Sequence, residues 1–167
     1  MLVDWVAVGS LATAFAVVVA FVELITSSRE RSRDDREAQA RKISAWIDSV
    51  VYDEPTTATA LNASDSPVYR FVAFLVLAQG AGPQTGEDVA TRDDDLAHPA
   101  ALLVLPPGRH PIKLSPWYGG DMGRRAGVEI AFTDASGRHW IRRVTGRLEQ
   151  TDTDAVEHYR LPMPGTW

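Results

Sequence analysis

The side chains of this chain that are best suited to metal binding or proton transfer are four scattered histidines: His98, His110, His139 and His158. Metal sites and acid–base sites need such groups to converge with one another or with carboxylates. No pair has the H-x-x-x-H or H-E-x-x-H spacing that places two imidazoles on one face of a helix. We therefore expect surface or strand-edge histidines, and the sequence predicts neither a metal site nor a cofactor.

The densest run of carboxylates is Asp93, Asp94 and Asp95. Hard cations such as Ca²⁺ take several oxygen ligands, which a flexible loop can supply. The run lacks the glycine and the bidentate glutamate of an EF-hand loop, so we interpret it as a solvated acidic loop. No catalytic residue is predicted, although a metal-dependent enzyme that uses these aspartates with His98 or His110 stays open as a third hypothesis.

The most site-like segment is an aromatic and basic loop. Trp117 and Tyr118 are followed by two glycines, and Arg124 and Arg125 come shortly afterwards. These glycines do not follow a strand and open a helix, so they do not form a phosphate-binding loop. Trp, Tyr and Arg dominate the energetics of protein interfaces. The four residues are the predicted binding site for a protein partner; the alternative is an aromatic pair that folds back onto the edge of the domain.

Six short runs are rich in β-branched or aromatic residues and are bounded by Gly, Pro, Asn or Asp, as strands are. They cover residues 50–52, 56–61, 68–77, 101–105, 128–133 and 139–143. Short strands without room for crossover helices favour a mainly β fold, an immunoglobulin-like antiparallel β-sandwich. Residues 80–99 and 114–127 are rich in Gly and Asp and are predicted to be loops.

One hairpin is predicted in detail. Residues 134–137 (DASG) fit a type I turn closed by a glycine, which would join the last two predicted strands. Alternation along these strands predicts which side chains face the core. They are Val128, Ile130, Phe132 and Trp140.

The N-terminal segment has the composition of a membrane-spanning helix. Residues 5–22 carry no charge, and two further apolar residues follow Glu23. A helix of about 20 apolar residues spans the roughly 30 Å hydrocarbon core of a bilayer. Residues 5–25 are therefore predicted to be an uncleaved transmembrane anchor. The alternatives are a buried helix or a signal peptide, although the positive n-region and A-x-A cleavage site of a signal peptide are missing.

The flanking charges predict the orientation of this anchor. Residues 28–42 contain six Lys or Arg and four acidic side chains, whereas only Asp4 precedes the helix. Basic residues near a membrane-spanning end stay cytoplasmic, and acidic residues contribute little to the rule. We expect a single-pass protein of the cell membrane with its N-terminus outside and its C-terminal domain in the cytoplasm.

The domain organisation follows from these patterns. Residues 27–47 are predicted to be a charged helical stalk, because opposite charges recur there at helical spacing. The predicted boundaries are 1–26 for the anchor, 27–47 for the stalk, 48–149 for the β-sandwich and 150–167 for a flexible tail.

Charge and cysteine content exclude some functions. Residues 43–167 carry eleven basic and sixteen acidic side chains, a balance of −5 that is unsuited to binding nucleic acid. The chain has no cysteine, which excludes disulfides and thiolate metal sites. The predicted partners are the lipid bilayer, through residues 5–25, and an unidentified protein.

Three segments carry a resemblance to a known group of proteins: residues 43–46 (ISAW), 62–69 (NASDSPVY) and 132–143 (FTDASGRHWIRR). Together with the apolar span and the Arg-rich stretch, the chain resembles small, uncharacterised actinomycete single-pass membrane proteins with a C-terminal β-sandwich-like domain. The resemblance covers most of residues 1–149 and implies a fold, with no catalytic residues to carry over.

These observations lead to one functional prediction. We expect a membrane-anchored, non-enzymatic interaction module that presents its β-sandwich to a protein partner at the inner face of the membrane. An envelope-facing sensor or adhesion domain on the same anchor is the alternative from a different class.

Overall fold

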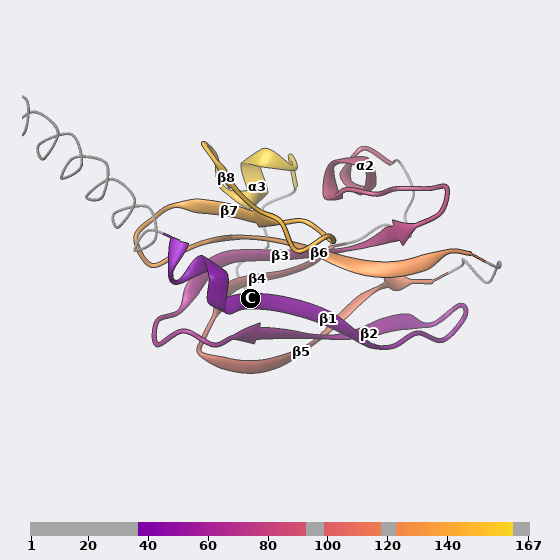
Figure 1. Ribbon diagram of the computed structural model, residues 1–167, viewed down its shortest axis with the longest axis horizontal. Coiled ribbons are helices and arrows are strands. Elements are labelled where there is room, and N and C mark those ends of the chain that lie inside the picture. Colours follow the sequence, from indigo (N-terminus) through magenta and orange to yellow (C-terminus); the bar gives the residue numbers. More distant parts are fainter. Residues whose placement is uncertain (1–36, 93–98, 118–122, 162–167) are drawn as a thin grey trace, which may run out of the picture. The chain divides into compact units, whose positions relative to one another are not determined.

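The computed structural model describes residues 37–92, 99–117 and 123–161 (Figure 1). The chain divides into two compact units, and the second, Gln39–Trp167, contains every described strand. In the described part no helix is long and apolar enough to cross a membrane. The predicted span at residues 5–25 lies outside that part.

The described residues contain eight strands in two antiparallel sheets, which form a sandwich-like arrangement (Figure 1). The smaller sheet has the order β1 (Ile43–Ser49), β2 (Pro55–Asn62) and β5 (Gly108–Pro116). The larger sheet has the order β4 (Ala100–Leu105), β3 (Val68–Gln79), β6 (Arg125–Thr133), β7 (His139–Arg142) and β8 (Leu148–Thr151). The predicted mainly β, antiparallel sandwich is confirmed at this level.

Three short helical segments accompany the sheets: η1 (Ala40–Lys42), α2 (Gly86–Ala90) and α3 (Ala155–His158). Figure 1 shows α2 and α3 on the face of the five-stranded sheet that is turned away from the three-stranded sheet. The five-stranded sheet is therefore covered on both faces, by the second sheet and by the two helices.

Five of the six predicted strands are confirmed as β2, β3, β4, β6 and β7. The prediction for residues 50–52 was wrong, because these residues connect β1 to β2 and form only an isolated bridge from Tyr52 to Trp117. Apolar composition alone suggested a strand there, but Val50, Val51 and Tyr52 are exposed and have no sheet to cover them.

Three strands were missed by the sequence analysis. β1 begins at Ile43, inside the range predicted as a helical stalk, and it faces the core with alternate residues. β5 contains Pro111, which a strand tolerates only at a sheet edge, and β5 is such an edge. β8 is four residues long and begins with its one large apolar residue, Leu148. β5 and β8 also contain several polar or charged residues, whereas β1 was missed because residues 43–47 were assigned to the stalk.

The predicted loops and tail also contain structure. α2 lies inside the predicted loop 80–99, and Thr85 begins it with a capping box in which Asp88 returns the hydrogen bond. β8 ends and α3 lies inside the predicted flexible tail 150–167. In α3, Asp154 accepts hydrogen bonds from the first backbone amides of the helix, as N-cap residues do.

Two apolar clusters follow from this layered arrangement. The first lies between the sheets and includes Phe71, Phe132 and Trp140. The second lies between the five-stranded sheet and the two helices and includes Phe74 and Tyr159. The long apolar run of β3 is explained by this division, because its alternate residues enter the two clusters on opposite faces.

The predicted hairpin between β6 and β7 is confirmed. The amide of Gly137 donates to the carbonyl of Asp134 over 3.0 Å, and Gly137 adopts a φ of 78° that suits glycine. The Asp134 carboxylate closes the turn, because it accepts from the amides of Ser136 and Arg138 and from Nε1 of Trp140. The predicted core face is confirmed as well, with Val128 partly buried and the other three side chains buried: Ile130, Phe132 and Trp140.

Candidate functional site

The residues predicted as a binding loop have different neighbours in the structure. Trp117 directly follows β5 in the sequence and is half-buried. Its carbonyl accepts a hydrogen bond from the amide of Asp53 over 3.3 Å. Arg124 and Arg125 are exposed at the start of β6, where Arg125 is the register partner of Gln79 on β3. Tyr118 lies outside the described residues.

The described residues of the predicted site contact different sheets. Trp117 contacts the connection between β1 and β2. Arg124 lies against Gly80, because a Cβ added to Gly80 would be 2.9 Å from Cγ of Arg124. The two arginines therefore belong to the end of the five-stranded sheet, and Trp117 belongs to the end of the three-stranded sheet.

The described histidines each have a local partner. Nε2 of His110 lies 2.9 Å from the carbonyl of Pro106, and Nε2 of His158 lies 2.9 Å from Oε1 of Glu87. Nδ1 of His139 lies 2.9 Å from the hydroxyl of Thr133. Within residues 37–92, 99–117 and 123–161, no group of three or more His, Asp or Glu is arranged to hold a metal ion. The acidic run at residues 93–95 and His98 lie outside that part.

A buried carboxylate on β6 is the centre of a polar cluster that joins the five-stranded sheet to the two helices. The side chain of Glu129 is fully buried. Its Oε1 accepts from the amide of Gly86 over 2.6 Å, from Tyr159 Oη over 3.1 Å and from Arg143 Nη1 over 3.2 Å. Its Oε2 has no hydrogen-bond partner. One oxygen of Glu129 thus joins β6 to α2, to the residue after α3 and to the turn after β7.

Arg143 is shared among three carboxylates. Its Nη1 lies 2.7 Å from Oε2 of Glu87, and its Nε lies 3.0 Å from Oε2 of Glu149 on β8. Glu87 contacts His158 through its other oxygen. The cluster therefore fastens both helices to the five-stranded sheet, with one guanidinium balancing carboxylates from α2, β6 and β8.

Two of the three glutamates in contact with Arg143, Glu129 and Glu87, have pKa values that move in opposite directions. Burial raises the pKa of Glu129, since the contacts with Gly86 and Arg143 do not compensate for its full loss of water. Burial also acts to raise the pKa of Glu87, but hydrogen bonds from Arg143 and His158 outweigh it and lower that pKa to about 2. Burial and the neighbouring glutamates raise the pKa of Tyr159.

The contacts of this cluster indicate a structural role and not a catalytic one. Every group in it except Oε2 of Glu129 is engaged by another element of the fold, and the carboxylate at its centre has no exposed surface on which a substrate could approach. Glu129 was not among the predicted site residues, because it stands between apolar residues in a predicted strand. The signal was a single carboxylate within a predicted strand that is otherwise rich in apolar residues.

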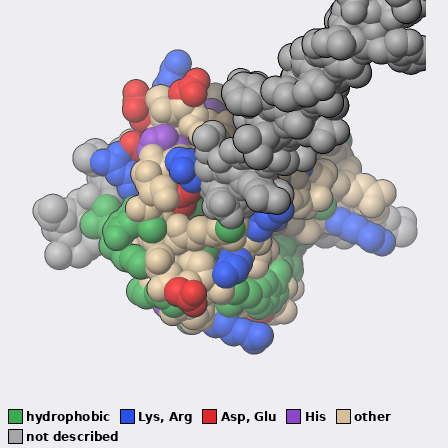
Figure 2. Space-filling view, turned by 60° about the vertical axis from the view of Figure 1, so that its left-hand side comes forward, with side chains coloured by type: hydrophobic (Ala, Val, Ile, Leu, Met, Phe, Trp, Pro, Cys, Tyr) green, Lys and Arg blue, Asp and Glu red, His purple; other side chains and the backbone are tan. Residues whose placement is uncertain are grey.

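A second feature is the edge strand β4, which pairs with β3 on one side only. Its sequence, AALLVL, contains no charge and no proline. Leu103 is 52 % exposed and Val104 is 46 % exposed, and Tyr69, the register partner of Val104, is 41 % exposed. Figure 2 shows that exposed hydrophobic side chains also form patches on the face that it presents.

The other edges carry features that discourage pairing with another chain. β5 contains proline, arginine and lysine, β1 has a bulge and an aspartate, and β8 is short and contains a glutamate. Among the described edge strands, β4 is the one without such protection.

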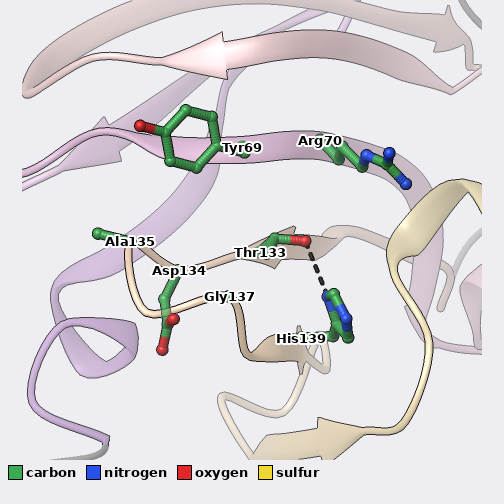
Figure 3. Close-up of a pocket in the computed structure, with 7 residues that line it drawn as sticks. All are labelled: Tyr69, Arg70, Thr133, Asp134, Ala135, Gly137 and His139. Carbon is green, nitrogen blue, oxygen red and sulfur yellow. Dashed lines mark hydrogen bonds between the residues drawn. The ribbon is translucent and has the colours of Figure 1, made fainter.

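A third feature is a pocket on the outer face of the five-stranded sheet (Figure 3). Tyr69 on β3 is the register partner of Thr133 on β6, which is in turn the partner of His139 on β7. Arg70 and the turn that begins at Asp134 complete the lining, and the pocket has a volume of about 380 Å³. His139 was one of the four scattered histidines of the sequence, and no local pattern indicated that it lies beside Tyr69 and Thr133.

Comparison of the chain with protein-family models, with curated proteins and with solved structures finds no match. The features of the described structure that bear on function are the fold, the edge strand and the pocket.

Proposed function

We propose that this protein is a membrane-anchored, non-enzymatic interaction module whose immunoglobulin-like β-sandwich binds a protein partner by strand addition at β4. The observation that carries the proposal is the exposed, uncharged edge of β4. The predicted anchor at residues 5–25 would hold the domain at the cytoplasmic face of the membrane.

The strand order supports the immunoglobulin-like part of the proposal. If the first seven strands are labelled A, B, C, C′, E, F and G, the sheets read A-B-E and C′-C-F-G. This arrangement has the immunoglobulin pairing of A with B and of C with F and G, with the fourth strand placed beside C. β8 extends the second sheet by one strand beyond G.

The chemistry of β4 supports strand addition as the binding mode. An extended segment can pair with the free backbone groups of an edge strand, and side-chain contacts then give specificity. Leu103, Val104 and Tyr69 present apolar surface beside this edge, and residues 100–105 carry no charge. The partner segment that fits is an extended, uncharged stretch with apolar side chains at alternate positions.

Photo-crosslinking in cells tests the proposal with the full chain. A photoreactive residue at Leu103 is expected to crosslink to a defined partner, whereas the same residue at Lys113, on the exposed side of β5, is the matched control. Adding Val104→Lys should reduce the Leu103 crosslink at least fivefold, because a charge beside the edge opposes burial. Equal crosslinks at both positions, or a Leu103 crosslink unaffected by Val104→Lys, would contradict strand addition.

A separate experiment tests on which side of the membrane the β-domain lies. The chain has no cysteine, so Arg147→Cys creates a single thiol at a side chain that is 77 % exposed. Labelling by a membrane-impermeant maleimide only after lysis supports a cytoplasmic domain. Labelling in intact cells would favour the envelope-facing alternative, in which the partner segment belongs to an extracytoplasmic protein.

A further inference from the structure

Arg70 reaches the outer face of the sheet through a β-bulge. The register between β3 and β6 shifts by one residue between Tyr69 and Val72, and Arg70 has a φ of 48°, which is unusual for a residue with a side chain. In a regular strand, Arg70 would face the core, opposite to Tyr69. The bulge instead leaves both residues exposed on the pocket side, where they line the pocket together.

Arg70 is held in place at one end. Its Nη1 is bonded to the carboxylate of Asp154, the N-cap of α3. Within the described residues this is the one ion pair of Arg70, and its side chain remains 47 % exposed. The pairing orients the guanidinium and leaves its other N–H groups for a further acceptor.

The single carboxylate of the pocket lining is not available to a ligand. Asp134 is buried, and both of its oxygens accept hydrogen bonds from the turn and from the core residue Trp140. In Figure 3 its carboxylate points away from Tyr69, Arg70 and His139. The lining groups that remain are therefore a guanidinium, a phenol, a hydroxyl and an imidazole.

Thr133 and His139 add to the donor character of the pocket. The Thr133 hydroxyl lies 2.9 Å from Nδ1 of His139. When this hydroxyl donates to Nδ1, a neutral imidazole carries its proton on Nε2 and offers an N–H there. A guanidinium and an imidazole N–H form a pair of donors that is matched by an oxyanion.

We propose that this pocket is a binding site for a small, soluble organic anion, whose carboxylate or phosphate group is bound by Arg70 and His139 and whose planar remainder lies on the ring of Tyr69. The volume of about 380 Å³ is within the range of small-molecule sites. The partly exposed ring of Tyr69 supplies an apolar surface beside the charged groups. The site shares Tyr69 with the apolar surface beside β4, but its charged groups, Arg70 and His139, lie on β3 and β7, so binding of an anion does not require strand addition.

Histidine NMR on the full chain in detergent micelles tests the site with defined probes. Benzoate and phenyl phosphate carry a ring and an anion, benzamide is the neutral control, and acetate lacks the ring. A saturable shift of the His139 ring signals is expected with benzoate or phenyl phosphate. The affinity obtained from it should be at least tenfold higher than the affinity for benzamide. The signals of His110, on the other sheet, serve as an internal control for partition into micelles.

Two variants connect such a shift to the pocket. Arg70→Gln should weaken binding of the preferred probe at least tenfold, whereas Arg109→Gln, which removes an exposed guanidinium from the other sheet, should not change it. Tyr69→Ala should weaken benzoate towards the affinity of acetate, and it provides a second test if Arg70→Gln disturbs α3. The relative affinity of benzoate and phenyl phosphate identifies the anion.

Three results would overturn the proposal. They are the absence of a saturable His139 shift with any oxyanion, equal affinity for benzoate and benzamide, and unchanged affinity in a folded Arg70→Gln variant.

Discussion

Nη1 of Arg143 lies 3.2 Å from Oε1 of Glu129, a glutamate whose side chain has no exposed surface. The pair joins the turn after β7 to the middle of β6, and the same guanidinium also contacts Glu87 on α2 and Glu149 on β8. A buried charge of this kind is retained only when a cation and hydrogen bonds compensate for its lost hydration. The stability of the helical layer should therefore depend on Arg143.

Replacing Arg143 by methionine should destabilise the domain by about 3–5 kcal/mol, since it leaves a buried carboxylate without its cation. The measurement is urea unfolding of the full chain in a mild detergent at pH 7. Arg147→Met is the matched control, because Arg147 is highly exposed and pairs with Glu149 over 3.4 Å. The control should change stability by less than about 1 kcal/mol. Equal effects of the two replacements would contradict a special role for Arg143.

The lowered pKa of Glu87 predicts a loss of stability in acid. Burial opposes its ionisation, but hydrogen bonds from Arg143 and His158 outweigh burial and hold the pKa at about 2, below the ordinary value of 4.5. A depressed pKa in the folded state contributes stability above pH 4.5, and that contribution is lost as the pH falls towards 2. The difference in unfolding free energy between wild type and Glu87→Gln should therefore shrink over this range. A constant difference would show that Glu87 is not specifically stabilised as an anion.

Glu129 should behave in the opposite sense. Burial raises its pKa above 4.5, so its contribution to stability is present below that value and is lost as the pH rises through the folded-state pKa. Wild type should thus become less stable relative to Glu129→Gln as the pH increases from about 4.5. Both variants are measured in the same series of buffers. The difference in unfolding free energy between wild type and variant should change with pH in opposite directions for Glu87→Gln and Glu129→Gln. Parallel curves would contradict the assignment of the charge on these two residues.

The close packing around the same carboxylate predicts the effect of a single methyl group. A Cβ on Gly86 would lie 2.7 Å from Oε1 of Glu129 and 2.8 Å from the rings of Phe74 and Tyr159. Alanine is favoured over glycine in a helix by about 1 kcal/mol, but overpacking of a buried contact costs about 1–3 kcal/mol. Gly86→Ala should therefore be destabilising in urea unfolding. In the same helix Glu87→Ala tests loss of an ion pair without overpacking, and the Gly86 variant should disturb the ring signals of Phe74, which Glu87→Ala should leave unchanged.

The parts of the fold that could be predicted from the sequence are those determined by residues close together in the chain. The run at residues 68–77 is apolar on both faces, and β3 is indeed covered on both. The turn at residues 134–137 carries its own geometry, since Asp134 bonds to the amides that follow it and Gly137 tolerates a positive φ. β5 was missed because Pro111 argues against a strand except at an edge, and edges are decided by topology.

The candidate sites could not be predicted in the same way, because distant segments build them. Glu129 meets Gly86, Arg143 and Tyr159 only after α2 and α3 pack on the sheet, and no local pattern links these positions. Arg70 has no intrinsic preference for a positive φ, so the bulge that brings it beside Tyr69 is not visible in the sequence. Trp117 and the two arginines are neighbours in sequence, but they contact different sheets.

Hydrogen bonds from Arg142 fix the first described residues of the β-domain. The Arg142 guanidinium donates to the carbonyl of Ile43 over 2.8 Å, to that of Ala40 over 3.0 Å and to that of Arg41 over 3.1 Å. Gln39 adds a second tie, since its Oε1 accepts from the amide of Ala135 over 2.9 Å. The short helical turn η1 is thus fixed to β7 and to the turn before it.

Removal of this contact should loosen the entry to the domain without unfolding the sheets. A hydrogen bond to a charged group contributes about 1.5–3 kcal/mol, and each 1.4 kcal/mol of local opening free energy changes amide exchange about tenfold. Arg142→Met should therefore accelerate hydrogen exchange at residues 40–43 about 10- to 100-fold, whereas exchange in β3 should stay unchanged. Arg147→Met is again the control for loss of an exposed arginine. Unchanged exchange at residues 40–43 would show that pairing of β1 with β2, which begins at Ile43, fixes this segment without help from Arg142.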